Sequence, residues 1–303
     1  MFIVTPRIGL CNQLQSIVKA ILLGIKYERN VYIDKFQINL YSSDLCDIHE
    51  ILNIEKINKY LISKNIQKCK ILDEIDKDIL KDLESYKIKN INYDELPGLN
   101  YINDKIEEIL HMPIIYLGNV VSLCIAKSFD CPWGDFSNSY YNLMSNLVFH
   151  DKFYNVKEKI KKSLNLVNYS IVHMRIEDDA LRHFSHCYNI SLSEYNKKLL
   201  DFYESEMSKV ENRIYICSGM LKYENTINFN YYSDLLTNNP LTCDKKNIDI
   251  DPYYLDNREL IAIIELLLAY DADKLIGCGC SSFSRCIENY FRCVKNNENV
   301  VLS

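Results

Sequence analysis

The sequence predicts an α/β protein made of two halves that face each other across a cleft. Short runs rich in β-branched residues alternate with amphipathic stretches, which is the pattern of α/β folds. With 303 residues, the chain is long enough for two domains. A second series of strand and helix patterns begins near Tyr169, so we place a boundary near 145–155. We therefore expect one domain over 1–150 and a second over 151–303.

The elements follow in order from local patterns. Apolar residues recur at helical spacing over 14–25, between the first two expected strands. Ser191 and Glu194 fit a capping box that begins a helix running to about Val210. Residues 255–270 are apolar on nearly every face and predict a buried helix. Strands are expected at Phe2–Val4, Val31–Ile33, Ile114–Leu117, Tyr169–His173, Arg213–Cys217, Lys274–Gly277 and Val300–Leu302.

Composition narrows the class of protein. The net charge is 35 − 41 = −6 with both signs mixed along the chain, which disfavours a nucleic-acid partner. The apolar run 260–269 contains Glu265 and is too short to span a bilayer. The first residues lack a signal-peptide pattern, so we expect a cytoplasmic protein. The 12 cysteines are interpreted mostly as small buried hydrophobic residues. Residues 52–103, rich in Ile, Lys, Asn and Asp, are expected to form surface helices and loops.

The first segment that could bind a ligand is the loop 7–13, between a strand and the start of a helix. The first turn of a helix presents free backbone N–H groups and the positive end of its dipole, and both favour anions. Gly9 lets the backbone approach a ligand. The alternative interpretation is an ordinary turn in which Asn12 caps the helix.

The second segment, residues 171–186, joins a buried strand to charged residues. Strand side chains alternate, so His173 and Arg175 share a face. Glu177, Asp178 and Asp179 follow at the carboxyl end of the strand, where parallel α/β sheets bind ligands. The planar guanidinium of Arg175 suits phosphate oxygens. The alternative is a structural ion pair between Arg175 and an acidic neighbour.

In the third segment, residues 275–291, a strand leads through small residues into a final helix. Ser281 and Ser282 are predicted to offer hydroxyl and N–H groups to a phosphate, with support from Arg285. The alternative is a serine that only caps the helix.

Metal binding is not expected. Cys278 and Cys280 lack the usual zinc spacing. Asp-x-Asp pairs, which bind Mn²⁺ or Mg²⁺ in one class of sugar transferase, occur at 249–251 and 271–273, but neither follows a strand. We predict neither a metal nor any other cofactor.

Taken in order, these segments resemble the GDP-fucose-dependent fucosyltransferase superfamily. GLCNQ resembles the motif Gly-x-Gly-Asn-Gln/Arg, VHMRIEDD resembles His-x-Arg with acidic residues behind it, and SSFS resembles the final serine-rich motif. The resemblance implies a GT-B-like pair of Rossmann-type domains, with GDP-fucose held mainly by the C-terminal one. It also implies inverting, metal-independent transfer of fucose to a hydroxyl of a glycan or of a protein Ser/Thr.

The same resemblance implies roles for individual residues. Arg175 would contact the β-phosphate and stabilise the leaving GDP, and His173 would lie beside the nucleotide. The other implied contacts to GDP-fucose come from Gly9, Asn12, Ser281, Ser282 and Phe283. The second glycine of the first motif is Cys11 in this chain.

The catalytic base stays open at this point. Gln13 and Gln15 cannot take a proton, so a base would come from Glu177, Asp178 or Asp179. Strand alternation favours Glu177, which equally suits an ion pair that orients Arg175. Two other functions are also open. One is metal-dependent transfer from another nucleotide sugar, and the other, suggested by Cys11, is non-catalytic binding of a nucleotide or glycan.

Overall fold

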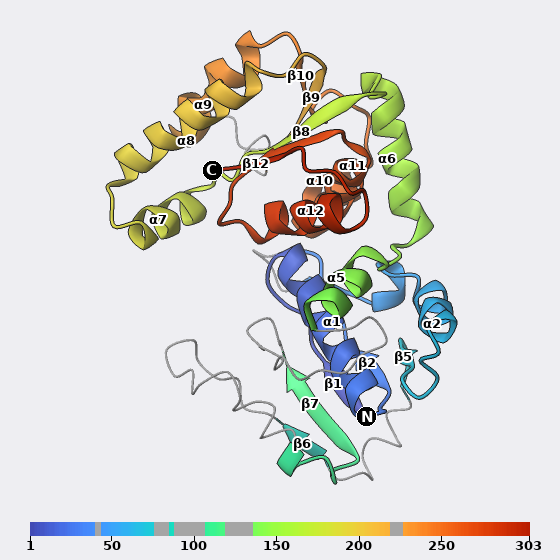
Figure 1. Ribbon diagram of the computed structural model, residues 1–303. Coiled ribbons are helices and arrows are strands. Elements are labelled where there is room, and N and C mark those ends of the chain that lie inside the picture. The colour runs from blue at the N-terminus through green and yellow to red at the C-terminus, as the bar shows by residue number, and fades with distance from the viewer. Residues whose placement is uncertain (40–43, 76–84, 88–106, 119–135, 219–226) are drawn as a thin grey trace. The chain divides into compact units, whose positions relative to one another are not determined.

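The structure is a computed structural model that describes residues 1–39, 44–75, 85–87, 107–118, 136–218 and 227–303. The chain divides into two compact units, Met1–Asp151 and Lys152–Ser303. Each unit contains a sheet of parallel strands with helices packed on it (Figure 1). The chain is therefore an α/β protein, as its sequence predicts.

The first unit is built on a parallel sheet of strand order β5-β2-β1-β7-β6. Its strands are β1 (Phe2–Val4), β2 (Val31–Ile33), β5 (Ile71–Leu72), β6 (Ser85–Lys87) and β7 (Ile114–Gly118). A short antiparallel pair joins β3 (Phe36–Gln37) to β4 (Leu45–Cys46). The helices are α1 (Leu10–Lys26), the 3-10 turn Ile48–Glu50, α2 (Ile54–Ser63) and α5 (Phe136–Ser145).

The expectation of only surface helices and loops over 52–103 is wrong where the structure describes this region. Strands β5 and β6 lie within it and pair in parallel with β2 and β7. Ile71–Leu72 has only two residues, and of Ser85–Lys87 only Tyr86 is of a type that favours strands, so neither segment shows a strand pattern in the sequence. Ile71 is buried because it lies beside Val31 in the sheet, a neighbour that local sequence does not reveal.

The second unit has a parallel sheet of order β10-β9-β8-β11-β12, which is 3-2-1-4-5 in chain order and typical of a Rossmann-type domain. The strands are β8 (Tyr169–His173), β9 (Arg213–Cys217), β10 (Thr242–Cys243), β11 (Lys274–Gly277) and β12 (Val300–Leu302). The helices are α6 (Asp151–Leu164), α7 (Asp178–Cys187), α8 (Leu192–Met207), α9 (Ile227–Asn238), α10 (Pro252–Asp256), α11 (Arg258–Asp271) and α12 (Ser282–Cys293).

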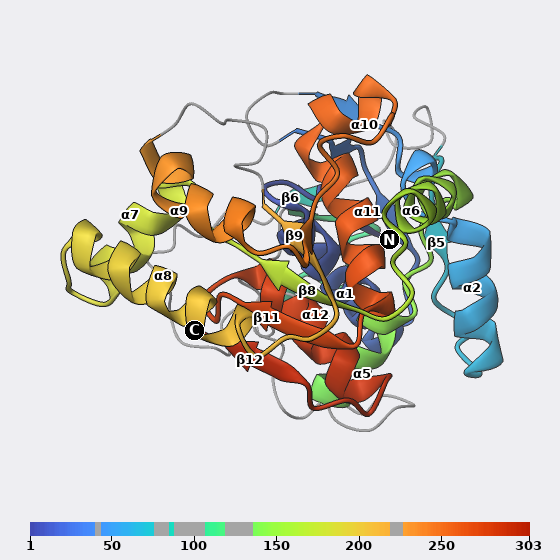
Figure 2. The same ribbon diagram turned by 90° about the horizontal axis from the view of Figure 1, so that it is seen from above.

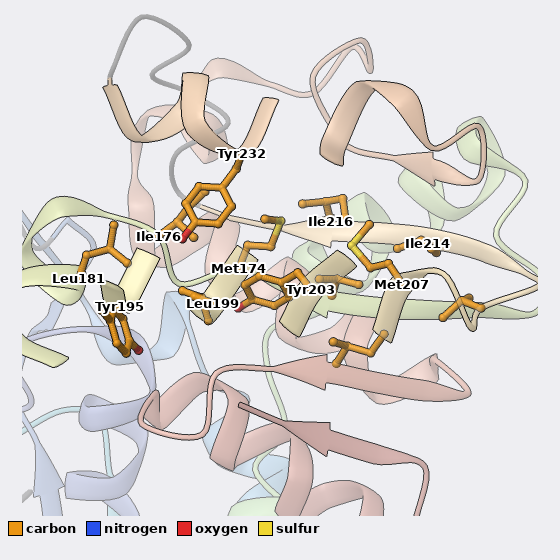
Figure 3. Packing of buried hydrophobic residues seen from close by; sticks show 13 residues of the cluster. Met174, Ile176, Leu181, Tyr195, Leu199, Tyr203, Met207, Ile214, Ile216 and Tyr232 are labelled. Atoms are coloured by element: carbon orange, nitrogen blue, oxygen red, sulfur yellow. The ribbon is translucent and has the colours of Figure 1, made fainter. Parts of the chain in front are cut away.

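Alternate residues of β8 face two different layers. Val172 and the next even-numbered residue, Met174, pack with α8, on the side where α9 also lies (Figures 1 and 3). Tyr169, of odd number, faces α11 on the opposite side, where its hydroxyl donates to the Leu268 carbonyl at 2.6 Å. Figure 2 shows from above that α8 and α9 lie on one side of the sheet and α11 lies on the other. Odd-numbered residues just after β8 therefore lie on the α11 side.

Most of the predicted elements are confirmed. All seven expected strands are present, with β7 longer by one residue. The Ser191 hydroxyl accepts from the Glu194 N–H at 3.2 Å, as a capping box requires, and the helix ends at Met207. The single helix expected over 255–270 is wrong, because Asn257 is extended and separates α10 from α11.

A buried ion pair anchors α11 against the sheet. Lys245 follows β10, and its Nζ lies 2.7 Å from Glu265 Oε1 on α11. The Tyr215 hydroxyl of β9 donates to the same oxygen at 3.4 Å. Burial raises the pKa of Glu265, whereas the neighbouring Lys245 opposes that rise. The pair ties α11, which begins at Arg258, to one side of the sheet.

None of the helices that the structure describes combines the length and the apolarity needed to cross a bilayer.

Candidate functional site

The order of strands in the second unit places two loops side by side. Strands β8 and β11 are neighbours, with Val172 paired to Ile276, and the strand order reverses between them. In open α/β sheets, ligands bind outside the carboxyl ends of the strands at such a reversal. Residues that follow β8 and β11 leave the sheet at this edge. His173, Arg175 and Glu177 come from the first loop, and Ser281, Ser282 and Phe283 come from the second.

Arg175 is held by two carboxylates. Met174 and Ile176 are buried in the core, so the residues between and after them, Arg175 and Glu177, turn away from it. Arg175 Nη1 lies 2.5 Å from Glu177 Oε2, and Nη2 lies 3.1 Å from Asp179 Oδ2. The predicted structural ion pair is therefore present. It fixes the guanidinium of Arg175 at the edge of the sheet.

A second arginine, which sequence reasoning missed, approaches the same carboxylate. Arg258 Nη2 lies 3.9 Å from Glu177 Oε1, and Arg258 Nη1 lies 3.5 Å from Glu259 Oε1. The side chain of Glu177 is only 13% exposed. Arg258 is the first residue of α11. The sequence marks it only as a charged residue that directly precedes the strongly apolar part of that helix. The two guanidinium groups thus share Glu177, while Asp179 contacts Arg175 and Glu259 contacts Arg258, and the guanidinium N–H groups are donors of the kind that bind phosphate oxygens.

His173 is buried at the end of β8, between two residues of α12. Its Nδ1 lies 2.7 Å from the Ser284 hydroxyl, and its ring centroid lies 4.7 Å from that of Phe283. Burial, with Arg175 and Arg258 nearby, lowers the pKa of His173 from 6.5 to about 3. The imidazole is therefore neutral at physiological pH. Phe283 was predicted to touch the ligand, and in the structure its ring packs on His173.

The second loop is shaped by local hydrogen bonds. Ser281 caps α12, its hydroxyl accepting from the Phe283 N–H at 3.3 Å, so the helix cap considered from the sequence is present. Ser282 is the first residue of the helix and is half-buried. Arg285 Nε donates to the Gly279 carbonyl at 2.8 Å and supports the loop before the helix. The first turn of α12 thus faces the same sheet edge as Arg175.

The other predicted residues, Gly9 and Asn12, lie in the first unit. Gly9 caps α1, so the interpretation of Asn12 as the cap is wrong. Asn12 is in the first turn, half-buried. A Cβ added at Gly9 would meet no atom within 4 Å. The side chain of Cys11, 3% exposed, belongs to the core.

Two glutamines hold the loop before α1. Ile8 has a φ of 77°, which strains a β-branched residue. Its N–H donates to Gln37 Oε1 at 3.0 Å, and its carbonyl accepts from Gln13 Nε2 at 2.8 Å. Gln13 also bonds the backbone carbonyl and N–H of Gln37, at 2.8 and 2.9 Å. Gln13 thus stabilises a strained loop, a role that its sequence position did not indicate.

The Asp-x-Asp pairs are engaged in the protein's own contacts. Asp271 Oδ2 lies 2.9 Å from Lys157 Nζ and 2.6 Å from Lys161 Nζ, and Asp249 lies 3.2 Å from Lys159. The Asp251 side chain accepts from the Tyr253 N–H to cap α10. Three of the four aspartates in these pairs, Asp249, Asp251 and Asp271, therefore contact groups of the protein itself.

Comparison with known proteins gives a consistent match for the fold. No family model matches the sequence, and no curated protein matches it. Among solved structures, the chain is similar to POFUT1 in complex with GDP-fucose, with a TM-score of 0.61 and 11% identity over 99% of this chain and 96% of that one. It is also similar to NodZ from Bradyrhizobium, a fucosyltransferase, with a TM-score of 0.57 and 10% identity over 95% of this chain and 91% of that one. The chain therefore has the fold of POFUT1 and of the fucosyltransferase NodZ.

This GT-B fold agrees with the family that the three sequence motifs resemble. A further match is NodZ α-1,6-fucosyltransferase soaked with GDP-fucose, with a TM-score of 0.59 and 10% identity over 95% of this chain and 92% of that one. At such identities the likeness concerns the fold alone. The residues that carry a function are argued from the site itself.

Proposed function

We propose that this chain is an inverting, metal-independent fucosyltransferase that moves fucose from GDP-fucose to a hydroxyl of a glycan or of a protein Ser/Thr. The observation that supports this proposal most strongly is the position of the Arg175 guanidinium. Glu177 and Asp179 hold it beside the carboxyl ends of β8 and β11, where the strand order reverses. The resemblance of the sequence motifs and the fucosyltransferase fold support the same donor.

In the proposed reaction the acceptor oxygen bonds to the fucose C1 as the bond between C1 and the β-phosphate oxygen breaks, the hydroxyl proton is released to solvent, and negative charge develops on the departing diphosphate. Arg175 would stabilise that charge with two parallel N–H donors. The first turn of α12, at Ser281 and Ser282, would add backbone N–H groups and the positive end of the helix dipole. This arrangement supplies from protein groups the charge stabilisation that a metal supplies in other transferases.

GDP and GDP-fucose are expected to raise the melting temperature, because each would bind the folded chain and not the unfolded one. At a ligand concentration about 100-fold above Kd, the stabilisation is about 2.7 kcal/mol, which corresponds to a shift of about 5–10 °C. The measurement is a thermal shift series with GDP, GDP-fucose, GDP-mannose, UDP and UDP-sugars. Equal shifts with UDP, or none with GDP, would contradict the proposed donor. Binding without hydrolysis or transfer would leave a non-catalytic binder.

We propose Glu177 as a positioning residue for Arg175 rather than the catalytic base. Its carboxylate lies 2.5 Å from Arg175 and 3.9 Å from Arg258, so both of its oxygens face guanidinium groups. Replacing it with glutamine, Glu177→Gln, is expected to weaken GDP binding and lower turnover by about tenfold to a hundredfold each, the value of a charge-assisted hydrogen bond. The measurements are GDP calorimetry and steady-state turnover on the same protein.

Asp178 is the matched control, because it is an exposed carboxylate in the first turn of α7 next to Glu177. Asp178→Asn should leave both quantities near their wild-type values. If Glu177→Gln lowered turnover by about 10²–10⁴ and left GDP affinity unchanged, Glu177 would be the base. Asp179→Asn completes the set and should resemble Glu177→Gln in direction, since Asp179 holds the other side of Arg175.

A further inference from the structure

The hydroxyl of Ser284 is placed where it decides which nitrogen of His173 carries the proton. Ser284 is fully buried on α12, and its Oγ lies 2.7 Å from His173 Nδ1. The same Oγ accepts a hydrogen bond from the Cys278 N–H at 3.1 Å. The two residues are 111 positions apart in the sequence and meet because β8 and β11 are neighbours.

Among the contacts that the described residues make at Ser284, one arrangement gives every polar group a partner. The Cys278 N–H can only donate, so Ser284 Oγ must accept there. The serine O–H then needs an acceptor of its own, and His173 Nδ1 lies at donor distance. A buried hydroxyl without an acceptor is costly, so Nδ1 acts as the acceptor and bears no proton. In a neutral imidazole the proton is then on Nε2.

The surroundings also fix the ring itself. Phe283 packs on the imidazole with centroids 4.7 Å apart, and the Tyr203 hydroxyl donates to the His173 carbonyl at 2.8 Å. Gly277 allows the close approach of α12, since a Cβ there would lie 2.6 Å from Ser284 Oγ. The ring is thus held on one face, at Nδ1 and through its backbone, and none of these contacts uses Nε2.

We propose that Ser284 is a positioning residue that holds His173 in the Nε2–H tautomer, so that His173 serves the diphosphate of the bound nucleotide sugar as a neutral hydrogen-bond donor. This inference rests on the proposed function. The opposite tautomer would present a lone pair at Nε2, which repels phosphate oxygens. A donor that stays neutral also keeps its proton through the physiological range.

The first test measures the tautomer directly. Two-bond ¹⁵N–¹H correlation spectra of histidine-labelled full-length protein distinguish a protonated from an unprotonated ring nitrogen, and His173→Gln assigns the signal. The wild type should show His173 with Nε2 protonated, and Ser284→Ala should show a mixture of tautomers. An Nδ1–H tautomer in the wild type, or an unchanged tautomer in Ser284→Ala, would overturn the role of Ser284. If the variant fails to fold, the wild-type spectrum alone still shows which nitrogen of His173 carries the proton.

The second test concerns the ligand. On saturation with GDP, the His173 Nε2 signal should shift, and Ser284→Ala should bind GDP about tenfold more weakly. Ser185→Ala is the matched control, because Ser185 is a buried helical serine whose hydroxyl donates to the Arg182 carbonyl instead. A Nε2 signal that stays unmoved at saturation would overturn the donor role.

The pH dependence provides a separate readout. GDP affinity should not change on account of His173 between about pH 5 and pH 8. A histidine that bound the diphosphate as a cation would instead lose affinity as the pH rose through 6.5, and that result would overturn the proposal. If GDP does not bind at all, the proposed function and the donor role fail, whereas the tautomer spectra still decide the role of Ser284.

Discussion

Replacing Arg175 with alanine is expected to lower fucosyl transfer by about 10²–10³-fold, which is the usual cost of removing one preorganised donor from a site of developing charge. The side chain is 17% exposed, and both of its Nη atoms lie at ion-pair distance from carboxylates. The guanidinium is therefore held in one orientation by the protein itself. The measurement is turnover with GDP-fucose, together with GDP calorimetry.

Arg175→Lys separates the role of charge from that of geometry. Lysine keeps a positive charge beside Glu177 and so maintains the fold, but a single ammonium cannot form two parallel hydrogen bonds. We expect the Arg175→Lys variant to remain as stable as the wild type but to recover little of the lost activity. Arg213 is the control, because it is exposed at the amino end of β9, whereas Arg175 lies where the carboxyl ends of the strands meet. Arg213→Ala should leave turnover unchanged. Retention of more than about a tenth of the wild-type turnover by Arg175→Ala would make Arg175 a structural residue.

Lys245→Met is expected to cost about 3–5 kcal/mol of unfolding free energy, the typical result of removing one partner of a buried ion pair. The change leaves the Glu265 carboxylate without its cation, in a place where burial already opposes ionisation. The double variant Lys245→Met/Glu265→Leu removes both charges and should recover most of the loss. Denaturant unfolding followed by circular dichroism measures all three proteins.

The destabilisation of Lys245→Met should depend on pH in a defined direction. Burial raises the pKa of Glu265 above its ordinary value of 4.5, and Lys245 is the main group that lowers it. Without Lys245, the folded chain holds a proton that the unfolded chain releases, so stability falls as the pH rises above 4.5. The loss should therefore be larger at neutral pH than near pH 5. A loss below about 1 kcal/mol at neutral pH would mean that the pair is screened like a surface pair.

Local sequence patterns determined most of the regular structure of this protein. Strand β8 was predictable from the β-branched pair Ile171 and Val172, and the start of α8 from the spacing of Ser191 and Glu194, whose capping hydrogen bond is present. Such patterns arise from the repeat of the backbone itself, so they are visible within a few residues. The motif around Arg175 was likewise visible, since His173, Arg175 and Glu177 are two residues apart.

Tertiary structure alone decided how these residues act. Arg258 approaches Glu177, and Ser284 bonds His173, across 81 and 111 positions of sequence respectively. The glutamines at 13 and 37 stabilise Ile8 from two different elements. No local pattern encodes these contacts, because they exist only where the strand order brings separate loops to one edge of a sheet. The sequence by itself determined the chemical groups available, and the packing of the sheets decided which nitrogen, carboxylate or hydroxyl each one meets.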